Sequence, residues 1–246
     1  MLDKVLELGF DGLATGHYAR LVARGDAVEL HRAFEPTKDQ SYVLAVLTQD
    51  KLARAWLPLG ASSKAEVRAE AGGRGLPVAH KAESMDLCFI EGGDTPGWLR
   101  AHIGPRPGEI VDESGNVLGA HDGTYLYTIG QRRGLNLRFP GEDGRPRFVI
   151  GLDAPGRRVV VGPRQRLARA HLETLPVVWS SGVAREAPFE GRAQVRAHGE
   201  EVACRVTPQD DGGVGIDLCT PMVGVAPGQT AVVYDGDLVV IAGMIK

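Results

Sequence analysis

The sequence predicts an α/β region with a parallel sheet, then a small central domain, and finally a C-terminal antiparallel β-barrel or sandwich. Up to about residue 90, short apolar segments alternate with segments of helical spacing, which is typical of a parallel α/β layer. From about residue 91, Gly and Pro separate short extended pieces. After about residue 172, short strands recur between turn residues at regular spacing. We therefore expect domains at residues 1–90, 91–171 and 172–246.

The first domain is expected to open with a helix and a strand. Apolar residues at positions 2, 5, 6 and 8 have a helical period, and Gly9 is a stop signal. Residues 10–15 are a short apolar run, which predicts a buried strand ending at Gly16. Because the chain opens inside the α/β pattern, with few strands before this turn, we expect its amino end to be incomplete.

The rest of the first domain continues the alternation. An extended run surrounds residues 28–30, helical spacing covers residues 41–57, and a short apolar run covers residues 86–90. Ser63 and Glu66 have the spacing of a capping box, which predicts a helix that stops at Gly72 and Gly73.

Extended pieces in the central domain are predicted at residues 125–129 and 148–152. The C-terminal strands are predicted at residues 175–179, 193–197, 202–206, 214–218, 230–234 and 238–242.

Composition excludes several protein classes. The chain has 246 residues, 43% hydrophobic and 24% charged, which excludes collagen, a disulfide scaffold and a coiled coil as descriptions of the whole. It has no apolar run long enough to cross a bilayer, and its first residues do not resemble a signal peptide. Three widely spaced cysteines without a C-x-x-C argue against a disulfide framework and a zinc ribbon. We expect a cytoplasmic protein without a membrane partner or a protein-bound metal.

The net charge of −3 conceals a strongly uneven distribution. Residues 1–130 carry 13 basic and 18 acidic side chains, and residues 171–246 carry 5 basic and 10 acidic ones. Residues 131–170 carry 10 Arg and only 3 acids, and we call this segment the basic island. Arg grips phosphates in a forked geometry, so a solvated charged face is the weaker explanation of such an excess.

Two polar motifs are predicted near ligand-binding positions of the first domain. The run ATGHYAR at residues 14–20 follows a predicted strand, where open α/β sheets place their ligands. The run KDQSY at residues 38–42 precedes a predicted helix, a place suited to phosphate or base contacts. A tight turn and ordinary helix capping are the structural alternatives, and spacing alone favours them.

Two further motifs follow. The run ESMDLCFI at residues 83–90 contains Cys88, with His80 and Lys81 upstream as groups that would favour a thiolate if the fold brings them close. A buried small hydrophobe is the alternative interpretation of this cysteine. We assign Cys204 and Cys219 to the core. The basic island is opened by YTIGQRRGL at residues 127–135, after a G-x-H-x-G at residues 119–123.

Taken in order, these motifs resemble those of the tRNA-specific 2-thiouridylase family, from residue 2 to the C-terminus. APGQ at residues 226–229 matches the family's closing barrel motif. The resemblance implies a PP-loop ATP pyrophosphatase domain, a central tRNA-binding domain and a C-terminal β-barrel. It implies an enzyme that uses ATP, with Mg²⁺ as its counter-ion, to adenylate the wobble uridine of tRNA. A cysteine persulfide, charged by a sulfur-relay donor protein, then delivers the sulfur.

The resemblance also implies roles for single residues. Cys88 matches the persulfide cysteine, and Gly16 matches a glycine that contacts ATP. The positions that match tRNA contacts are His17, Lys38, Asp39, Gln40, Arg196 and Gln229.

Some family features are not in this sequence. The S-G-G-V-D-S phosphate loop is absent, as is the first catalytic cysteine that pairs with the persulfide cysteine, and both would lie upstream of Met1. Ala197 stands where the family commonly has Tyr. We expect an enzyme whose isolated chain carries a persulfide and binds tRNA weakly. The alternatives are a non-catalytic tRNA-binding module and one half of a split thiouridylase.

Overall fold

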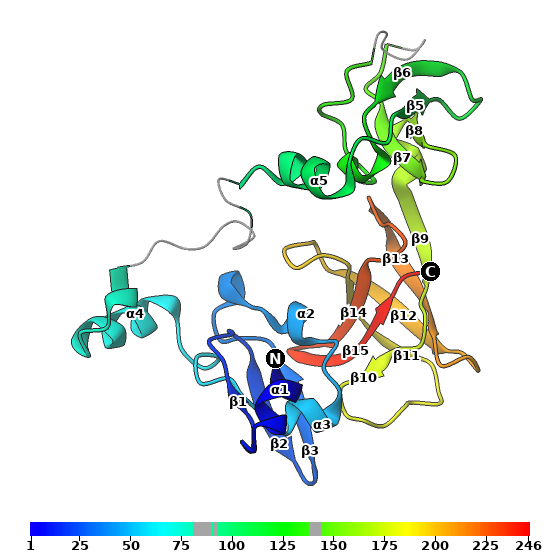
Figure 1. Ribbon diagram of the computed structural model, residues 1–246. Helices are drawn as coiled ribbons and strands as arrows, with labels where there is room; N and C mark the ends of the chain where they lie inside the picture. The colour runs from blue at the N-terminus through cyan, green and yellow to red at the C-terminus, as the bar shows by residue number, and fades with distance from the viewer. Residues whose placement is uncertain (81–89, 91–92, 138–143) are drawn as a thin grey trace. The chain divides into compact units, whose positions relative to one another are not determined.

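The computed structural model describes residues 1–80, 90, 93–137 and 144–246 (Figure 1). The chain forms two compact units. Unit 1 comprises Met1–Lys81, Ala170–Pro221 and Pro227–Lys246, and unit 2 comprises Ala82–Arg169 and Met222–Ala226. Within the described part of the chain, no helix has the length and apolar character needed to cross a bilayer.

Unit 1 begins with the predicted helix and a small parallel sheet. Helix α1 (Leu2–Glu7) is followed by Gly9 at φ +87°, a backbone conformation that glycine adopts without strain. Strands β1 (Leu13–Ala14) and β4 (Ala55–Trp56) pair in parallel, as the α/β pattern predicts. Strand β1 is shorter and more exposed than the strand predicted over residues 10–15, since only Leu13 and Ala14 are in it and Phe10 is 63% exposed.

The segments of helical spacing differ in how well they match the prediction. Residues 41–57 contain two short helices, α2 (Ser41–Leu44) and α3 (Gln49–Leu52), because Thr48 takes an extended conformation and starts a new helix. Helix α4 (Lys64–Gly73) has the predicted capping box. The Ser63 hydroxyl accepts from the Glu66 amide, and the Glu66 carboxylate accepts from the Ser63 amide. The short 3-10 helices η1 (Pro36–Lys38) and η2 (Pro77–His80) complete this part of the chain.

The extended run around residues 28–30 is a strand, but it lies in an antiparallel sheet and not in the predicted parallel sheet. Strands β2 (Arg20–Arg24) and β3 (Ala27–His31) form an antiparallel hairpin, and β3 pairs with β15 (Leu238–Met244) through His31 and Leu238. Gln49 ties this hairpin to the C-terminal region, because its amide group bonds the Val28 backbone and the Ser180 carbonyl. The N-terminal hairpin therefore extends the barrel sheet and not the parallel sheet.

The C-terminal strands confirm the predicted barrel-type sheet. The main sheet has the strand order β2-β3-β15-β14-β11-β12-β13-β9 (Figure 1). Within it, neighbouring strands from β15 through β13 in this order pair in antiparallel. The remaining strands of the path are β9 (Ala168–Glu173), β11 (Phe189–Gln194), β12 (Val202–Pro208), β13 (Val214–Val223) and β14 (Thr230–Asp235). Strand β10 (Val178–Trp179) lies off this path and pairs with β15.

Alternation along these strands decides which side chains enter the core. Ile216 and Leu218 of β13 point inward, so Cys219 points outward and is exposed, and its assignment to the core was wrong. Cys204 of β12 is fully buried as expected, and burial raises the pKa of its thiol to about 11. Both are free thiols. The core also contains Leu30 and Leu44 from the first domain, together with residues of β14 and β15.

Unit 2 is built on a four-stranded sheet, β6-β5-β8-β7, in which only β5 and β8 are parallel. Its described elements are α5 (Thr95–Ile103), β5 (Gly108–Val111), β6 (Val117–His121), η4 (Thr124–Leu126), β7 (Phe148–Asp153), β8 (Arg158–Gly162) and η5 (Arg164–Leu167). The predicted extended piece at residues 148–152 is confirmed by β7. The one at residues 125–129 is wrong at its start, because backbone bonds to Gly123 and Thr124 close a 3-10 turn there.

Candidate nucleic-acid interface

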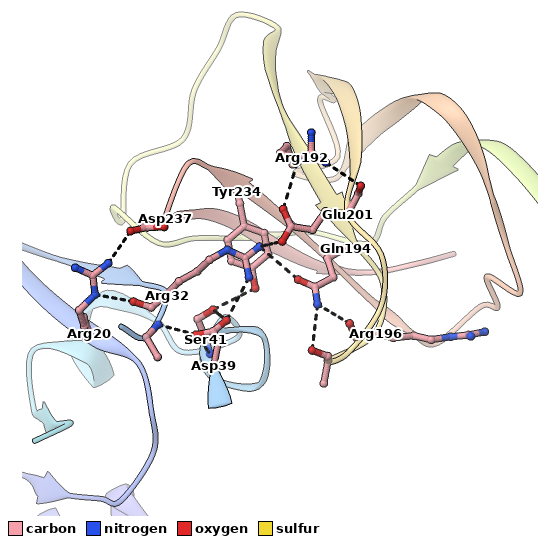
Figure 2. Close-up of polar contacts among 12 residues, drawn as sticks. Arg20, Arg32, Asp39, Ser41, Arg192, Gln194, Arg196, Glu201, Tyr234 and Asp237 are labelled. Atoms are coloured by element: carbon pink, nitrogen blue, oxygen red, sulfur yellow. Dashed lines mark hydrogen bonds and ion pairs between the residues drawn. The ribbon is translucent and has the colours of Figure 1, made fainter. Parts of the chain in front are cut away.

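Unit 1 brings together motif segments that lie far apart in the sequence. The runs at residues 14–20 and 38–42 bond to each other through Tyr18 and Gln40, and Ser41 and Tyr42 contact Tyr234 and Thr230 of the barrel. Arg32, which pairs with Asp39, bonds Glu201 just before β12 (Figure 2). The hairpin β2-β3 makes this possible, because its pairing with β15 carries the segment after β3 to the barrel. Most of the predicted contact residues therefore come from one continuous region.

Gln40 joins the two N-terminal motifs. Its backbone amide donates to the Tyr18 carbonyl at 2.8 Å, and its side-chain Oε1 accepts from the Tyr18 amide at 2.9 Å. Tyr18 is 5% exposed, so this pair of bonds satisfies backbone groups that water cannot reach. Gln40 thus holds the position of the backbone next to His17.

Asp39 is occupied by donors within unit 1. Oδ1 accepts from the backbone amides of Ala33 and Ser41 at 2.8 and 3.2 Å, and Oδ2 accepts from the Ser41 hydroxyl at 2.7 Å. Arg32 Nη1 also approaches Oδ2 at 3.2 Å, and the carboxylate side chain is only 8% exposed. Asp39 is therefore an internal acceptor, although the N-cap of α2 is Gln40 and no described side chain caps that helix. A direct RNA contact by Asp39 stays a prediction.

Arg32 is the centre of the network drawn in Figure 2. Its Nη2 donates to Glu201 Oε1 at 2.7 Å, and its guanidinium carbon lies 3.5 Å from the centroid of the Tyr234 ring. With Asp39 on its other nitrogen, this side chain is bound by two carboxylates and one aromatic face, and it is 16% exposed. Arg32 therefore links the segment after β3 to both β14 and the loop after β11.

A second arginine extends the same network. Arg20 Nε donates to the Arg32 carbonyl at 2.7 Å, and its Nη2 pairs with Asp237 at 2.7 Å (Figure 2). On the other side, Arg192 binds both the carboxylate and the backbone carbonyl of Glu201. Arg20, Arg32 and Glu201 are not among the predicted site residues. Arg20 closes the ATGHYAR run, and no other pattern marks them.

Tyrosines close the contact between α2 and the barrel. The Tyr42 hydroxyl donates to the Thr230 carbonyl at 2.8 Å, and the Ser41 hydroxyl lies 3.3 Å from the Tyr234 hydroxyl. Burial raises the pKa of Tyr234 to about 12. Burial also raises the pKa of Tyr42, and the nearby positive charge of Arg196 opposes that rise.

Two predicted contact residues of the barrel lie at the edge of this region. Arg196 is exposed, and Figure 2 shows its guanidinium directed away from Arg32. Gln229 is partly exposed and precedes Thr230, whose carbonyl accepts from Tyr42. The structure therefore places Arg196 and Gln229 close to the KDQSY segment, where Lys38 is also partly exposed.

The environment of Gly16 leaves space for a ligand. Of the described side chains, a Cβ at this position would meet that of Leu59 alone, at 3.6 Å, and the backbone φ does not require glycine. Next to it, His17 Nδ1 and the Thr15 hydroxyl lie 2.9 Å apart, which fixes the imidazole ring. Packing within unit 1 does not explain the glycine, and the site fits a ligand that approaches the backbone closely.

Cys88 and Lys81 lie outside the described residues, so the structure does not place the predicted persulfide cysteine. His80, the other group upstream of it, is exposed. Among the described residues, no cluster of His, Cys, Asp and Glu side chains is arranged to hold a metal ion.

The G-x-H-x-G and basic-island motifs lie in unit 2. His121 is 5% exposed and contacts the Tyr127 ring at 5.6 Å between centroids, and burial lowers its pKa. The described arginines at positions 132, 133, 157, 158 and 164 of the basic island are exposed. These side chains are available to a polyanion, whereas His121 belongs to the interior.

Comparisons with known proteins agree with the order of these parts. Family models described as "tRNA methyl transferase HUP domain", "tRNA methyl transferase PRC-barrel domain" and "Aminomethyltransferase beta-barrel domain" match residues 1–92, 97–163 and 169–245.

Curated relatives match over nearly the whole chain. A tRNA-specific 2-thiouridylase MnmA of Kineococcus radiotolerans is 54% identical over 96% of this chain and 66% of its own length. The proteins of the same name from Cutibacterium acnes and Streptomyces coelicolor are 50% and 48% identical, over 98% of this chain in each case. The chain spans just under two thirds of the length of these relatives. With its three matched domains in order and about half of its residues identical to these proteins, the chain belongs to the tRNA-specific 2-thiouridylase family.

Proposed function

We propose that the chain binds tRNA and takes part in the ATP-dependent 2-thiolation of its wobble uridine. The observation that carries this proposal is the convergence of these segments in unit 1: Gln40 bonds Tyr18, and Tyr42 bonds Thr230 next to Gln229 and feels the charge of Arg196. Relatives that share about half of the sequence are named as tRNA-specific 2-thiouridylases.

The binding half of the proposal rests on charge and exposure. Lys38 and Arg196 supply positive charge beside the Gln40 and Gln229 amides, and phosphate contacts from such residues fix the register of an RNA on a protein. His17 lies next to the backbone that Gln40 holds in place. The exposed arginines of the basic island supply further phosphate contacts, and Asp39 contributes by fixing the KDQSY segment.

The chemical half rests on Cys88 and Gly16. ATP supplies activation of the uridine C2 oxygen as a leaving group, and a persulfide on Cys88 supplies the sulfur. The space above Gly16 admits the nucleotide close to the backbone, which a side chain at this position would narrow. A sulfur-relay donor protein charges Cys88, a second thiol releases the transferred sulfur by forming a disulfide with Cys88, and the reaction belongs to the cytoplasm.

The test is made in cells that depend on this gene for thiolation, with its native upstream sequence retained. We expect Cys88→Ser to abolish 2-thiouridine in tRNA digests analysed by mass spectrometry. Cys219→Ser is the matched control, because Cys219 is an exposed thiol on β13 and its loss should leave thiolation unchanged.

Two outcomes would contradict the catalytic part of the proposal. Unchanged thiolation in Cys88→Ser cells would favour a non-catalytic tRNA-binding module. Co-purification of a separate chain that carries the phosphate loop would identify a split enzyme.

Binding is measured independently with purified chain and tRNA, where Arg196→Ala should weaken the complex.

A further inference from the structure

Beside the Arg32 network, unit 1 contains an open pocket of about 450 Å³. Arg20 and Asp237 line one part of it, and Phe34 and Pro36 line another. The rest of the lining comes from Arg32, Ala33, Asp39, Gln194, residues 197–199 and Glu201. The pocket therefore adjoins both the KDQSY segment and Arg196, the residues for which tRNA contact is proposed.

The charges that line this pocket already neutralise one another. Arg32 is bound by Asp39 and Glu201, and Arg20 is bound by Asp237. Because Arg192 also pairs with Glu201, three guanidinium groups are matched by three carboxylates, so a phosphate would meet as much negative as positive charge. The pocket is suited to a neutral, polar group and not to an anion.

An exposed aromatic ring lines the same pocket. Phe34 is 65% exposed, although the hydrogen bond from its amide to the Gly60 carbonyl at 2.8 Å fixes its backbone. An aromatic face on a fixed backbone is a stacking platform for a nucleobase, and such stacking is tolerant of sequence.

Hydrogen bonds fix the part of the lining at residues 197–199. Gln194 Nε2 donates to the carbonyls of Arg196 and Ala197, and the Gly199 amide closes the turn on the Arg196 carbonyl at 2.9 Å. A Cβ at Gly199 would lie 3.2 Å from Arg196 atoms, so the tight turn favours glycine. A preformed wall of this kind lowers the ordering cost of binding.

We propose that this pocket binds one unpaired nucleobase of the RNA, stacked on Phe34. The edge of the base faces the Arg20 guanidinium, a donor, and the Glu201 and Asp237 carboxylates, which accept from ring or amino N–H groups. The inference rests on the proposed tRNA binding and adds to it a site for a single-stranded nucleotide, distinct from the phosphate contacts of Lys38 and Arg196.

The experiment measures the affinity of the full chain for a fluorescent stem-loop RNA by anisotropy. A fully duplex RNA of the same length serves as the comparison ligand. We expect Phe34→Ala to weaken stem-loop binding by roughly 5- to 150-fold, the range for loss of one base–aromatic stack. Duplex binding should be unchanged. Phe10→Ala is the matched control, because Phe10 is 63% exposed in the same unit and does not line the pocket.

Two further variants make the result specific. Phe34→Tyr should restore stem-loop affinity, and in Phe34→Trp the added indole emission should be quenched by the stem-loop RNA and not by the duplex. Equal affinity of Phe34→Ala and wild type for the stem-loop would overturn the nucleobase pocket while leaving tRNA binding intact. Failure of the wild-type chain to bind either RNA would instead overturn the proposed function, and the pocket with it.

Discussion

The arginines of the candidate site in unit 1 and those that open the basic island in unit 2 differ in their surroundings. In unit 1, Arg20, Arg32 and Arg192 are bound by carboxylates within the unit. In unit 2, the described arginines at 132 and 133 are exposed at the start of the basic island. A count of arginines along the sequence treats both groups alike. The comparison shows that an arginine near a binding region stabilises the fold where acidic side chains occupy it, and is available to RNA where no acidic side chain of the described residues does.

The largest expected effect is the loss of folding stability when Arg32 is replaced. Replacing it by Ala leaves Asp39 and Glu201 without their cation while Asp39 stays 8% exposed, and breaking a buried pair in this way costs about 3 kcal/mol. The free energy of unfolding, measured in urea, should fall by about that amount. Arg158→Ala is the control, because that side chain is exposed in unit 2 and such a change alters stability by about 0.5 kcal/mol or less.

Arg32→Lys sharpens the same test. Lysine keeps the charge but lacks the planar fork that reaches two carboxylates and stacks on Tyr234, so we expect an intermediate loss of stability. If Arg32→Ala and Arg158→Ala had equal unfolding free energies, the distinction between paired and exposed arginines would be wrong.

The next effect concerns binding and not stability. The double change Arg132→Ala and Arg133→Ala should weaken tRNA binding and lower the slope of log affinity against log salt by about 1.8, the value for two lost phosphate contacts. The measurement is anisotropy of labelled tRNA over a range of salt concentrations. Arg192→Ala is the control, since its guanidinium is bound by Glu201 and its loss should leave the salt slope unchanged.

Several features of the fold could be predicted because they depend on neighbouring residues. The capping box of α4 needs only Ser63 and Glu66, and the strands of the barrel follow from apolar alternation between turns. The same alternation would have placed Cys219 outside, had it been applied through Ile216 and Leu218.

Other features depend on contacts between distant parts of the chain. The pairing of His31 with Leu238 joins residues more than 200 positions apart, and neither strand carries a signal that names its partner. The same holds at the candidate site. Arg32 directly follows β3, but the Glu201 carboxylate that it binds lies 169 positions further along the chain, and no motif marks that pairing.

The smallest expected effect is on the pH dependence of folding stability, to which a tyrosine of unit 1 and a tyrosine of unit 2 contribute differently. Burial raises the pKa of Tyr234 to about 12 in unit 1 and also raises that of Tyr127 in unit 2. In the unfolded chain a tyrosine loses its proton near pH 10, so above that pH the unfolded state binds fewer protons than the folded one. The stability due to neutral Tyr234 is therefore complete below pH 10 and is lost as the pH rises from about 10 to about 12. Tyr234→Phe keeps the ring under Arg32 and removes the ionisable group. The free energy of unfolding, measured in urea between pH 8 and pH 11, should therefore decline less steeply with pH than in wild type.

Tyr127→Phe should reduce the steepness of this decline by a smaller amount, because Tyr127 is only partly buried. Equal slopes in wild type and Tyr234→Phe would mean that the hydroxyl near Ser41 is accessible to water, and that the contact between α2 and the barrel is looser than the Arg32 network implies.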